Sequence, residues 1–286
     1  MRLGGFFDPQ TTEELDAICE KLDCYGLSAI RAPKRILEMS DDECVLFGEK
    51  AAKLGLYIGE AGFWESMITR DQDLRSRRIQ IVRETLRKAD LMNCNAVVTL
   101  VGSIDAQDRR FAPYGYMYSD ECKKEFREIV LRILDGMELK HTKYCIEPWI
   151  NTFFYQPEEI REFIDDLGHP YFGVHLDQMN LISQKDFFNT TPLINRTFDM
   201  LADKVVSVHL KDLRWDVCRS VIKWDECDIG DGVMDYDTYL TRLQTLDANM
   251  TCYLEHMSEE RDYALNFARL QALAKKSGVK FLRRGE

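Results

Sequence analysis

Four short apolar segments in the second half of the chain each end in a side chain that can bind a metal ion. The segments read KYCIEPW, FGVHLDQMN, VVSVHLKD and TCYLEHM, and their candidate ligands are Glu147, Asp177, His209 and Glu255. Each ligand lies where an apolar run stops, which is where a parallel strand passes into a loop. Three carboxylates and one imidazole supply the oxygen and nitrogen donors that a divalent cation prefers. We therefore predict one metal site formed by these four residues.

Residues two apart on a strand point to the same side of the sheet, so neighbours of the ligands can be placed as well. His175 lies two residues before Asp177, and Lys211 lies two residues after His209. We expect both side chains beside the metal. His256 directly follows the last ligand, so the same alternation predicts that it points away from the site.

The elements that must position these residues alternate regularly along the chain. Strand-like apolar runs are each followed by an amphipathic, helix-like run, and they comprise residues 2–7, 26–32, 56–61, 95–103, 143–149, 172–177, 205–212 and 251–256. This alternation is typical of an α/β fold, the (β/α)8 or TIM barrel, in which catalytic groups collect at the carboxyl ends of the strands. A doubly wound open sheet would not bring ligands from four consecutive strands together. We predict a single barrel domain over residues 1–286.

Several local signals support the helices of this pattern. Ser40 and Glu43 have the spacing of a capping box, and Pro157 stands at a first-turn position. Two long connections, residues 104–118 and 213–235, interrupt the rhythm. Connections of that length are usually functional, so we expect both to border the site.

The composition restricts the partners of the protein. Its net charge is −11, and an acidic surface repels phosphate backbones, so nucleic acid is not an expected partner. The sequence has no run of 18 apolar residues and no basic amphipathic stretch, so no membrane contact is expected. Nine cysteines without a CxxC pair indicate core packing in a reducing compartment, and we expect a cytoplasmic protein. The start, MRLGGFFDPQ, is unlike a signal peptide.

The chain resembles the xylose-isomerase-like sugar phosphate isomerase/epimerase superfamily, which includes ketose 3-epimerases, inositol-catabolic isomerases and hydroxypyruvate isomerases. The resemblance extends over essentially the whole chain and is most specific in IEPW, HLDQMN, VHLKD, IGDGVMDYDTYL and LEH. Residues 229–236 resemble the family's G-x-G-x-(V/M)-D segment. In the family's epimerases a Glu, an Asp, a His and a Glu on strands five to eight hold the metal, and they map onto Glu147, Asp177, His209 and Glu255.

The resemblance implies a metal-dependent isomerase or epimerase that acts on a sugar, keto-sugar or inositol derivative through α-proton abstraction and an enediolate. Mn²⁺ is the expected ion, with Mg²⁺, Co²⁺ and Zn²⁺ as alternatives. Glu147 and Glu255 would take and return the proton. Lys211 would stabilise the enediolate oxygen or bind a substrate carboxylate or phosphate, and His175 would orient a hydroxyl or shuttle a proton.

Outside the ligands, the chain departs from the pattern of the ketose epimerases. Asn180 stands where those enzymes usually carry a histidine, and Arg31 stands where many members carry a glutamate on strand two. An arginine often follows the histidine ligand, and Arg214 lies near that position. We expect Asn180, Arg31, Arg214 and two aromatic residues, Trp64 and Trp215, to contact the substrate.

Other functions share this scaffold. If a leaving group lies β to the enolate, the same first step gives a lyase, such as a dehydratase or a 3-keto-C-glycoside deglycosidase with a small β-rich partner subunit. Asn180 and the connection 213–235 keep this alternative open. An endonuclease-IV-like enzyme would need additional metal ligands and a basic face. The chain has only five histidines and a net charge of −11, which disfavours this function. A barrel that only binds a sugar or a partner is a further alternative. Barrels of this family often form homo-oligomers.

Overall fold

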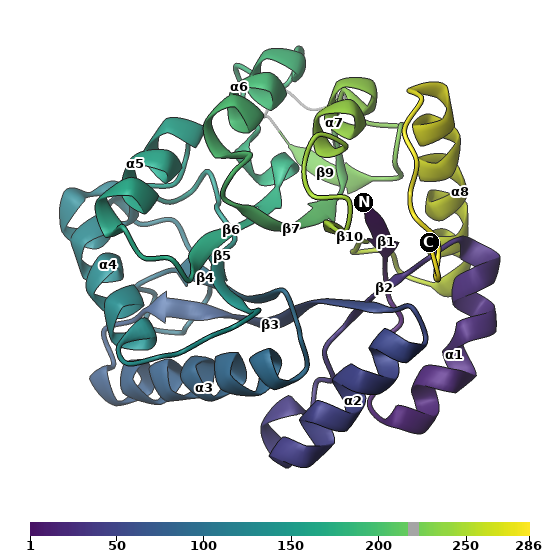
Figure 1. The fold of residues 1–286 in the computed structure, drawn as a ribbon. Coiled ribbons are helices and arrows are strands. Elements are labelled where there is room, and N and C mark those ends of the chain that lie inside the picture. Colours follow the sequence, from purple (N-terminus) through teal and green to yellow (C-terminus); the bar gives the residue numbers. More distant parts are fainter. Residues whose placement is uncertain (217–222) are drawn as a thin grey trace.

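The computed structural model describes residues 1–216 and 223–286 and has the predicted barrel architecture. Within the described residues, eight parallel strands form one sheet in the order β1-β10-β7-β6-β5-β4-β3-β2, and the helices surround this sheet (Figure 1). The sheet is nearly closed, because the Ser28 N–H of the segment leading into β2 donates to the Leu3 carbonyl of β1 at 3.0 Å. The fold is a single (β/α)8 TIM barrel.

Each of the eight predicted apolar runs overlaps a barrel strand. The strands are β1 (Arg2–Gly4), β2 (Ala29–Arg31), β3 (Tyr57–Ile68), β4 (Ala96–Gly102), β5 (Lys143–Ile146), β6 (Phe172–Asp177), β7 (Val205–Leu210) and β10 (Thr251–Leu254). Most are shorter than the run that predicted them. Strand β3 is longer than the predicted 56–61, because it continues to pair with β4 after a register shift between Phe63 and Ser66.

Eight α-helices and three 3-10 helices connect the strands within the described part of the chain. They are α1 (Thr12–Tyr25), α2 (Asp41–Lys53), α3 (Gln72–Leu91), α4 (Asp120–Leu134), α5 (Pro157–Leu167), α6 (Thr191–Leu201), α7 (Tyr236–Leu243), α8 (Glu260–Lys276), η1 (Ile36–Glu38), η2 (Gly115–Tyr118) and η3 (Gln178–Leu181). The capping box of Ser40 and Glu43 opens α2, and Pro157 lies in the first turn of α5, as predicted. In the described ranges, none of these helices is long and apolar enough to cross a membrane.

Tyr253 on β10 connects strands across the barrel interior. Its hydroxyl accepts a hydrogen bond from the Gly59 N–H at 2.9 Å and donates one to the Ile30 carbonyl at 2.6 Å. A Cβ on Gly59 would lie 2.3 Å from that hydroxyl oxygen, so only glycine allows β3 to approach this closely. The interior beneath the strand ends is therefore fixed by packing and by hydrogen bonds.

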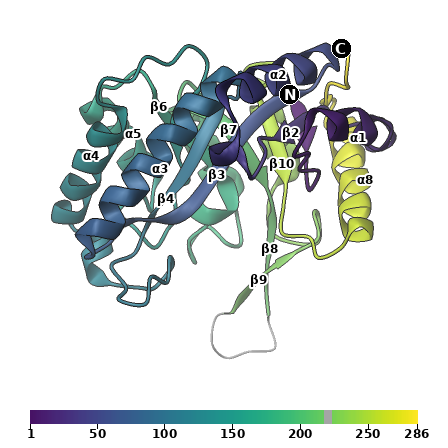
Figure 2. The same ribbon diagram turned by 90° about the horizontal axis from the view of Figure 1, so that it is seen from below.

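The long connection after β7 contains a β-hairpin, which the sequence pattern did not indicate. Strand β8 (Asp212–Trp215) pairs antiparallel with β9 (Trp224–Cys227), and the hairpin projects from the barrel (Figure 2). Strands of four residues that mix charged and aromatic side chains carry too little periodicity to be predicted. Residues 217–222 of the connection lie outside the described residues.

Asp212 holds residues 230–234, near the end of this connection, by hydrogen bonds. Its buried carboxylate accepts hydrogen bonds from the backbone N–H groups of Leu213, Gly230, Gly232 and Met234 at 2.8–3.2 Å. A Cβ on Gly232 would lie 2.1 Å from the Asp212 Oδ1 atom. Asp212, two residues after the end of β7, and the glycines of residues 229–236 thus belong to one structural unit.

Candidate metal centre

The structure brings the four predicted ligands together at the carboxyl ends of β5, β6, β7 and β10. One ligand atom from each of Glu147, Asp177, His209 and Glu255 lies within 4.8 Å of the others. Glu147, Asp177 and His209 are buried, and the Glu255 side chain is only 12% exposed. Three carboxylates and one imidazole this close together fit a single divalent cation, because both the donor types and their crowding are those of a metal site.

Lys211 lies among these carboxylates. Its ammonium nitrogen is 2.9 Å from the Asp177 Oδ2 atom and 2.6 Å from the Glu255 Oε1 atom. The lysine therefore partly balances the negative charge of the cluster. Its position next to the ligands is the predicted one, although β7 ends one residue earlier, at Leu210.

Glu147 is held by two neutral donors. The Asn180 side-chain amide donates to its Oε1 atom and the Trp64 indole N–H donates to its Oε2 atom, both at 2.8 Å. Asn180 lies on η3, directly after β6, and Trp64 lies on β3. Two residues that the sequence assigned to substrate binding thus contact a predicted metal ligand.

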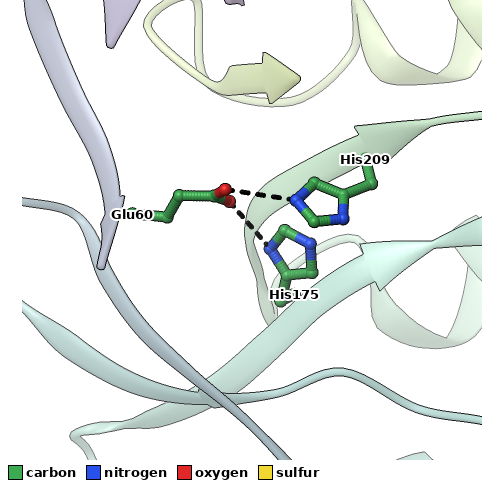
Figure 3. Close-up of side chains that lie close together, drawn as sticks. All are labelled: Glu60, His175 and His209. Atoms are coloured by element: carbon green, nitrogen blue, oxygen red, sulfur yellow. Dashed lines mark hydrogen bonds and ion pairs between the residues drawn. The ribbon is translucent and has the colours of Figure 1, made fainter. Parts of the chain in front are cut away.

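Glu60 is a further buried acid in the site, and sequence reasoning missed it. It extends from β3 toward His209 and His175 on β7 and β6 (Figure 3). The Glu60 Oε1 atom is 3.2 Å from His209 Nε2, and its Oε2 atom is 3.5 Å from His175 Nδ1. Arg31 on β2 donates to the same Oε1 atom at 2.9 Å. The available signal was the one charged residue within the third predicted strand, LYIGEA.

The two glutamates among the ligands differ in acidity because their neighbours differ. Burial raises the pKa of Glu147 to about 7, although the positive His209 opposes the rise. Burial also opposes ionisation of Glu255, but His209 and Lys211 hold its pKa well below the ordinary value. A pair of acids with separated pKa values can divide the roles of proton donor and acceptor.

The two histidines of the site, His209 and His175, also differ in pKa because their neighbours differ. Burial disfavours a charged imidazole, yet the carboxylates of Glu255 and Glu60 raise the pKa of His209 to about 10. Burial and the neighbouring His209 lower the pKa of His175 to about 3. His175 also shares a hydrogen bond of 2.6 Å between its Nδ1 atom and the Ser207 hydroxyl. His175 is therefore a neutral, internal residue at neutral pH.

A cavity of about 260 Å³ borders the ligand cluster and is lined by Glu147, Glu255, Lys211 and Arg31. Its volume lies just below the lower end of the range of small-molecule pockets, roughly 300–1,000 Å³. Such a space suits a small molecule whose reacting atoms meet the ligand cluster.

Aromatic rings form part of the cavity wall. Trp64, Trp149 and Phe111 line it, and the ring centroids of Phe111 and Trp149 are 4.6 Å apart. Arg110 of the connection 104–118 also lines the cavity, so that connection borders the site as predicted. Trp149 was not assigned to substrate binding, although an aromatic residue two positions after the ligand Glu147 was a usable signal.

His256 was predicted to point away from the site, and this prediction was wrong. The residue lines the cavity, and its Nδ1 atom is 2.8 Å from a Glu226 carboxylate oxygen of β9. Strand β10 ends at Leu254, and His256 has a positive φ of 62°. Alternation applies only within a strand, so it could not place this side chain.

Two predicted substrate-binding residues lie on the hairpin strand β8 rather than among the ligands. Trp215 is half-buried and packs against Phe187 and Phe188, with ring centroids 5.6 and 5.3 Å away. Arg214 is exposed and lies opposite Asp225 of β9. Their contact with a substrate stays a prediction.

Comparison with known families agrees with the fold. The family model described as xylose isomerase-like TIM barrel matches residues 11–284, and the chain belongs to this family. No curated protein matches the sequence.

Solved structures of similar fold have low sequence identity to the chain. D-psicose 3-epimerase in the presence of D-fructose is 14% identical, with a TM-score of 0.62, over 97% of this chain and 99% of that chain. Endonuclease IV from Thermus thermophilus is 16% identical, with a TM-score of 0.69, over 96% and 100%. The IOLI protein with a bound zinc atom is 15% identical, with a TM-score of 0.59, over 97% and 96%. At such identities the likeness shows the fold alone.

Proposed function

We propose that the protein is a divalent-metal-dependent isomerase or epimerase that acts on a small sugar, keto-sugar or inositol derivative. The observation that carries this proposal is the group of four ligands within 4.8 Å, which borders a cavity of about 260 Å³. Mn²⁺ is the preferred ion, because three carboxylates and one imidazole form a donor set rich in oxygen. Family membership supports the proposal, as do the similar structures of a D-psicose 3-epimerase and of a zinc-containing IOLI protein.

The bound ion would act as a Lewis acid toward adjacent carbonyl and hydroxyl oxygens of the substrate. Glu147 and Glu255 both line the cavity, so each can reach a proton on a substrate carbon next to the carbonyl. One carboxylate removes this proton and the other carboxyl group returns a proton, to the same carbon in an epimerase or to its neighbour in an isomerase.

Lys211 and the aromatic wall would orient the substrate. The Lys211 ammonium group lines the cavity and lies 5.9 Å from the centre of the Trp149 ring. It can donate to the substrate oxygen on which negative charge develops when the proton leaves. Trp149 and Trp64 offer flat apolar surfaces for the C–H face of a sugar.

Turnover in D₂O tests the proposal and separates it from a lyase. Metal-loaded protein is incubated with ketohexoses, inosose and 3-keto-glycosides, and the products are analysed by NMR and mass spectrometry. We expect one substrate to acquire deuterium at the carbon next to its carbonyl without losing a group. Chelation should stop the reaction, and Mn²⁺ or Co²⁺ should restore it.

Two results would contradict the proposal in different ways. Release of water or of an aglycone from the substrate would establish the lyase alternative on the same scaffold. Turnover that persists after exhaustive chelation would exclude the metal-dependent mechanism altogether.

A further inference from the structure

We propose that Glu60 is a positioning residue that holds His209 with its Nδ1 atom directed at the metal ligands. This inference rests on the proposed function, because it concerns the ion that the four ligands would bind. It assigns a role to a buried acid that is not itself one of those ligands (Figure 3).

The two nitrogens of the His209 ring face different carboxylates. The Nδ1 atom is 2.8 Å from Glu255 Oε1, on the side of the ligand cluster, and the Nε2 atom is 3.2 Å from Glu60 Oε1. An ionised carboxylate can only accept hydrogen bonds, so the Nε2 atom must carry the proton that points at Glu60. By the same rule, Nδ1 carries a proton that points at Glu255 when no ion is bound. A cation among the ligands would displace this Nδ1 proton, whereas the Nε2 proton would remain directed at Glu60.

Glu60 is itself held in place by Arg31, and its second oxygen lies beside the neutral His175. The Arg31 Nε atom donates to its Oε1 atom at 2.9 Å, and His175 Nδ1 lies 3.5 Å from its Oε2 atom. Glu60 and His175 are fully buried, so no water competes for these contacts. Arg31 also approaches Glu255 Oε2 at 3.7 Å and thereby connects Glu60 to a second ligand. A buried acid with this geometry can orient His209 with little freedom.

A second metal ion is the main competing explanation for this cluster. Donor atoms of Glu60, His175 and His209 also lie within 4.8 Å of one another. However, the Arg31 guanidinium already contacts the Glu60 carboxylate at 2.9 Å, and its fixed positive charge opposes a cation there. The positioning role agrees with the contacts of Glu60 with Arg31 and His209, and we therefore prefer it.

Metal affinity measured without turnover provides the first test. Mn²⁺ is titrated calorimetrically into metal-free wild type, Glu60→Gln and the control Glu125→Gln. Glu125 is a partly buried acid on α4, paired with Arg75 and Tyr116 away from the ligand cluster. We expect one ion per wild-type chain and an affinity about 10–100-fold weaker in Glu60→Gln. Glu125→Gln should keep the wild-type affinity, even if it unfolds more easily.

The protonation pattern of His209 provides a second test, which needs no variant that could fail to fold. Long-range ¹H–¹⁵N spectra of the Zn²⁺-loaded wild type distinguish the two ring nitrogens of each of the five histidines. We expect His209 to carry its proton on Nε2.

The outcomes separate the two proposals. If the wild type binds an ion, the positioning role is overturned by an unchanged affinity in Glu60→Gln, by a proton on Nδ1 of His209, or by a second ion that disappears in Glu60→Gln. If the wild type binds no ion at all, the proposed function fails and this inference fails with it.

Discussion

At the scale of single residues, identical side chains differ in chemistry because their neighbours differ. Glu147 accepts hydrogen bonds from the neutral donors Asn180 and Trp64, and burial raises its pKa to about 7. Glu255 lies against the positive groups of His209 and Lys211, so its pKa is lowered although burial opposes this. The two glutamates therefore differ in acidity, because one lies against neutral donors and the other against positive groups.

The Glu255→Gln variant tests whether this carboxylate transfers the proton. Glutamine keeps the size of the side chain and an oxygen that can bind metal, but it cannot take a proton. We expect turnover to fall by about 10²–10⁴-fold, since general acid–base groups contribute that much, while metal still binds. Steady-state rates and metal content are measured together, with the exposed Glu128→Gln on α4 as control. A wild-type rate in Glu255→Gln would remove this residue from the proton transfer.

Residues at strand ends were predictable from the sequence, whereas contacts across the barrel were not. Glu147, Asp177, His209 and Glu255 each follow an apolar run, and a barrel collects such positions at one face. Glu60 lies on β3 and meets its partners on β6 and β7 through the barrel interior. No local pattern in one sequence reveals a contact of that kind.

At the scale of the elements, the alternation of apolar and amphipathic runs indicated the eight strands and helices. Strands and helices have different hydrophobic periodicities, which runs of this length reveal. Strand ends were less predictable, since pairing with neighbours decides where a strand stops. The hairpin β8–β9 escaped prediction because its strands contain only four residues each and mix charged with aromatic side chains. Asp212 then connects this hairpin to residues 230–234 through backbone N–H groups.

Substitution of Gly232 tests the tight approach of this segment to Asp212. A Cβ at Gly232 would lie 2.1 Å from the Asp212 Oδ1 atom, whereas a Cβ at Gly115 would have no atom within 4 Å. We expect Gly232→Ala to lower the free energy of unfolding by about 1–3 kcal/mol, the usual cost of overpacking. Denaturant unfolding of Gly232→Ala and the matched control Gly115→Ala measures this difference. Equal stability of the two variants would contradict the role given to Asp212.

At the scale of the whole molecule, the fold alone would allow nucleic acid as a partner, whereas the net charge disfavours it. The fold is shared with endonuclease IV, at a TM-score of 0.69, but a common fold does not establish a common function. A net charge of −11 disfavours binding to a phosphate backbone. A small carbohydrate-like substrate, homo-oligomers and a β-rich partner subunit stay predictions.

We infer that the carboxyl ends of β5, β6, β7 and β10 together form one metal site. Calorimetric titration of Mn²⁺ into metal-free protein, with Asp177→Asn as comparison, tests this most directly. We predict one ion per wild-type chain and an affinity at least about 100-fold weaker in Asp177→Asn, because loss of a ligand should cost no less than loss of an outer partner. A wild type that binds no ion, or an Asp177→Asn variant with undiminished affinity, would contradict the account.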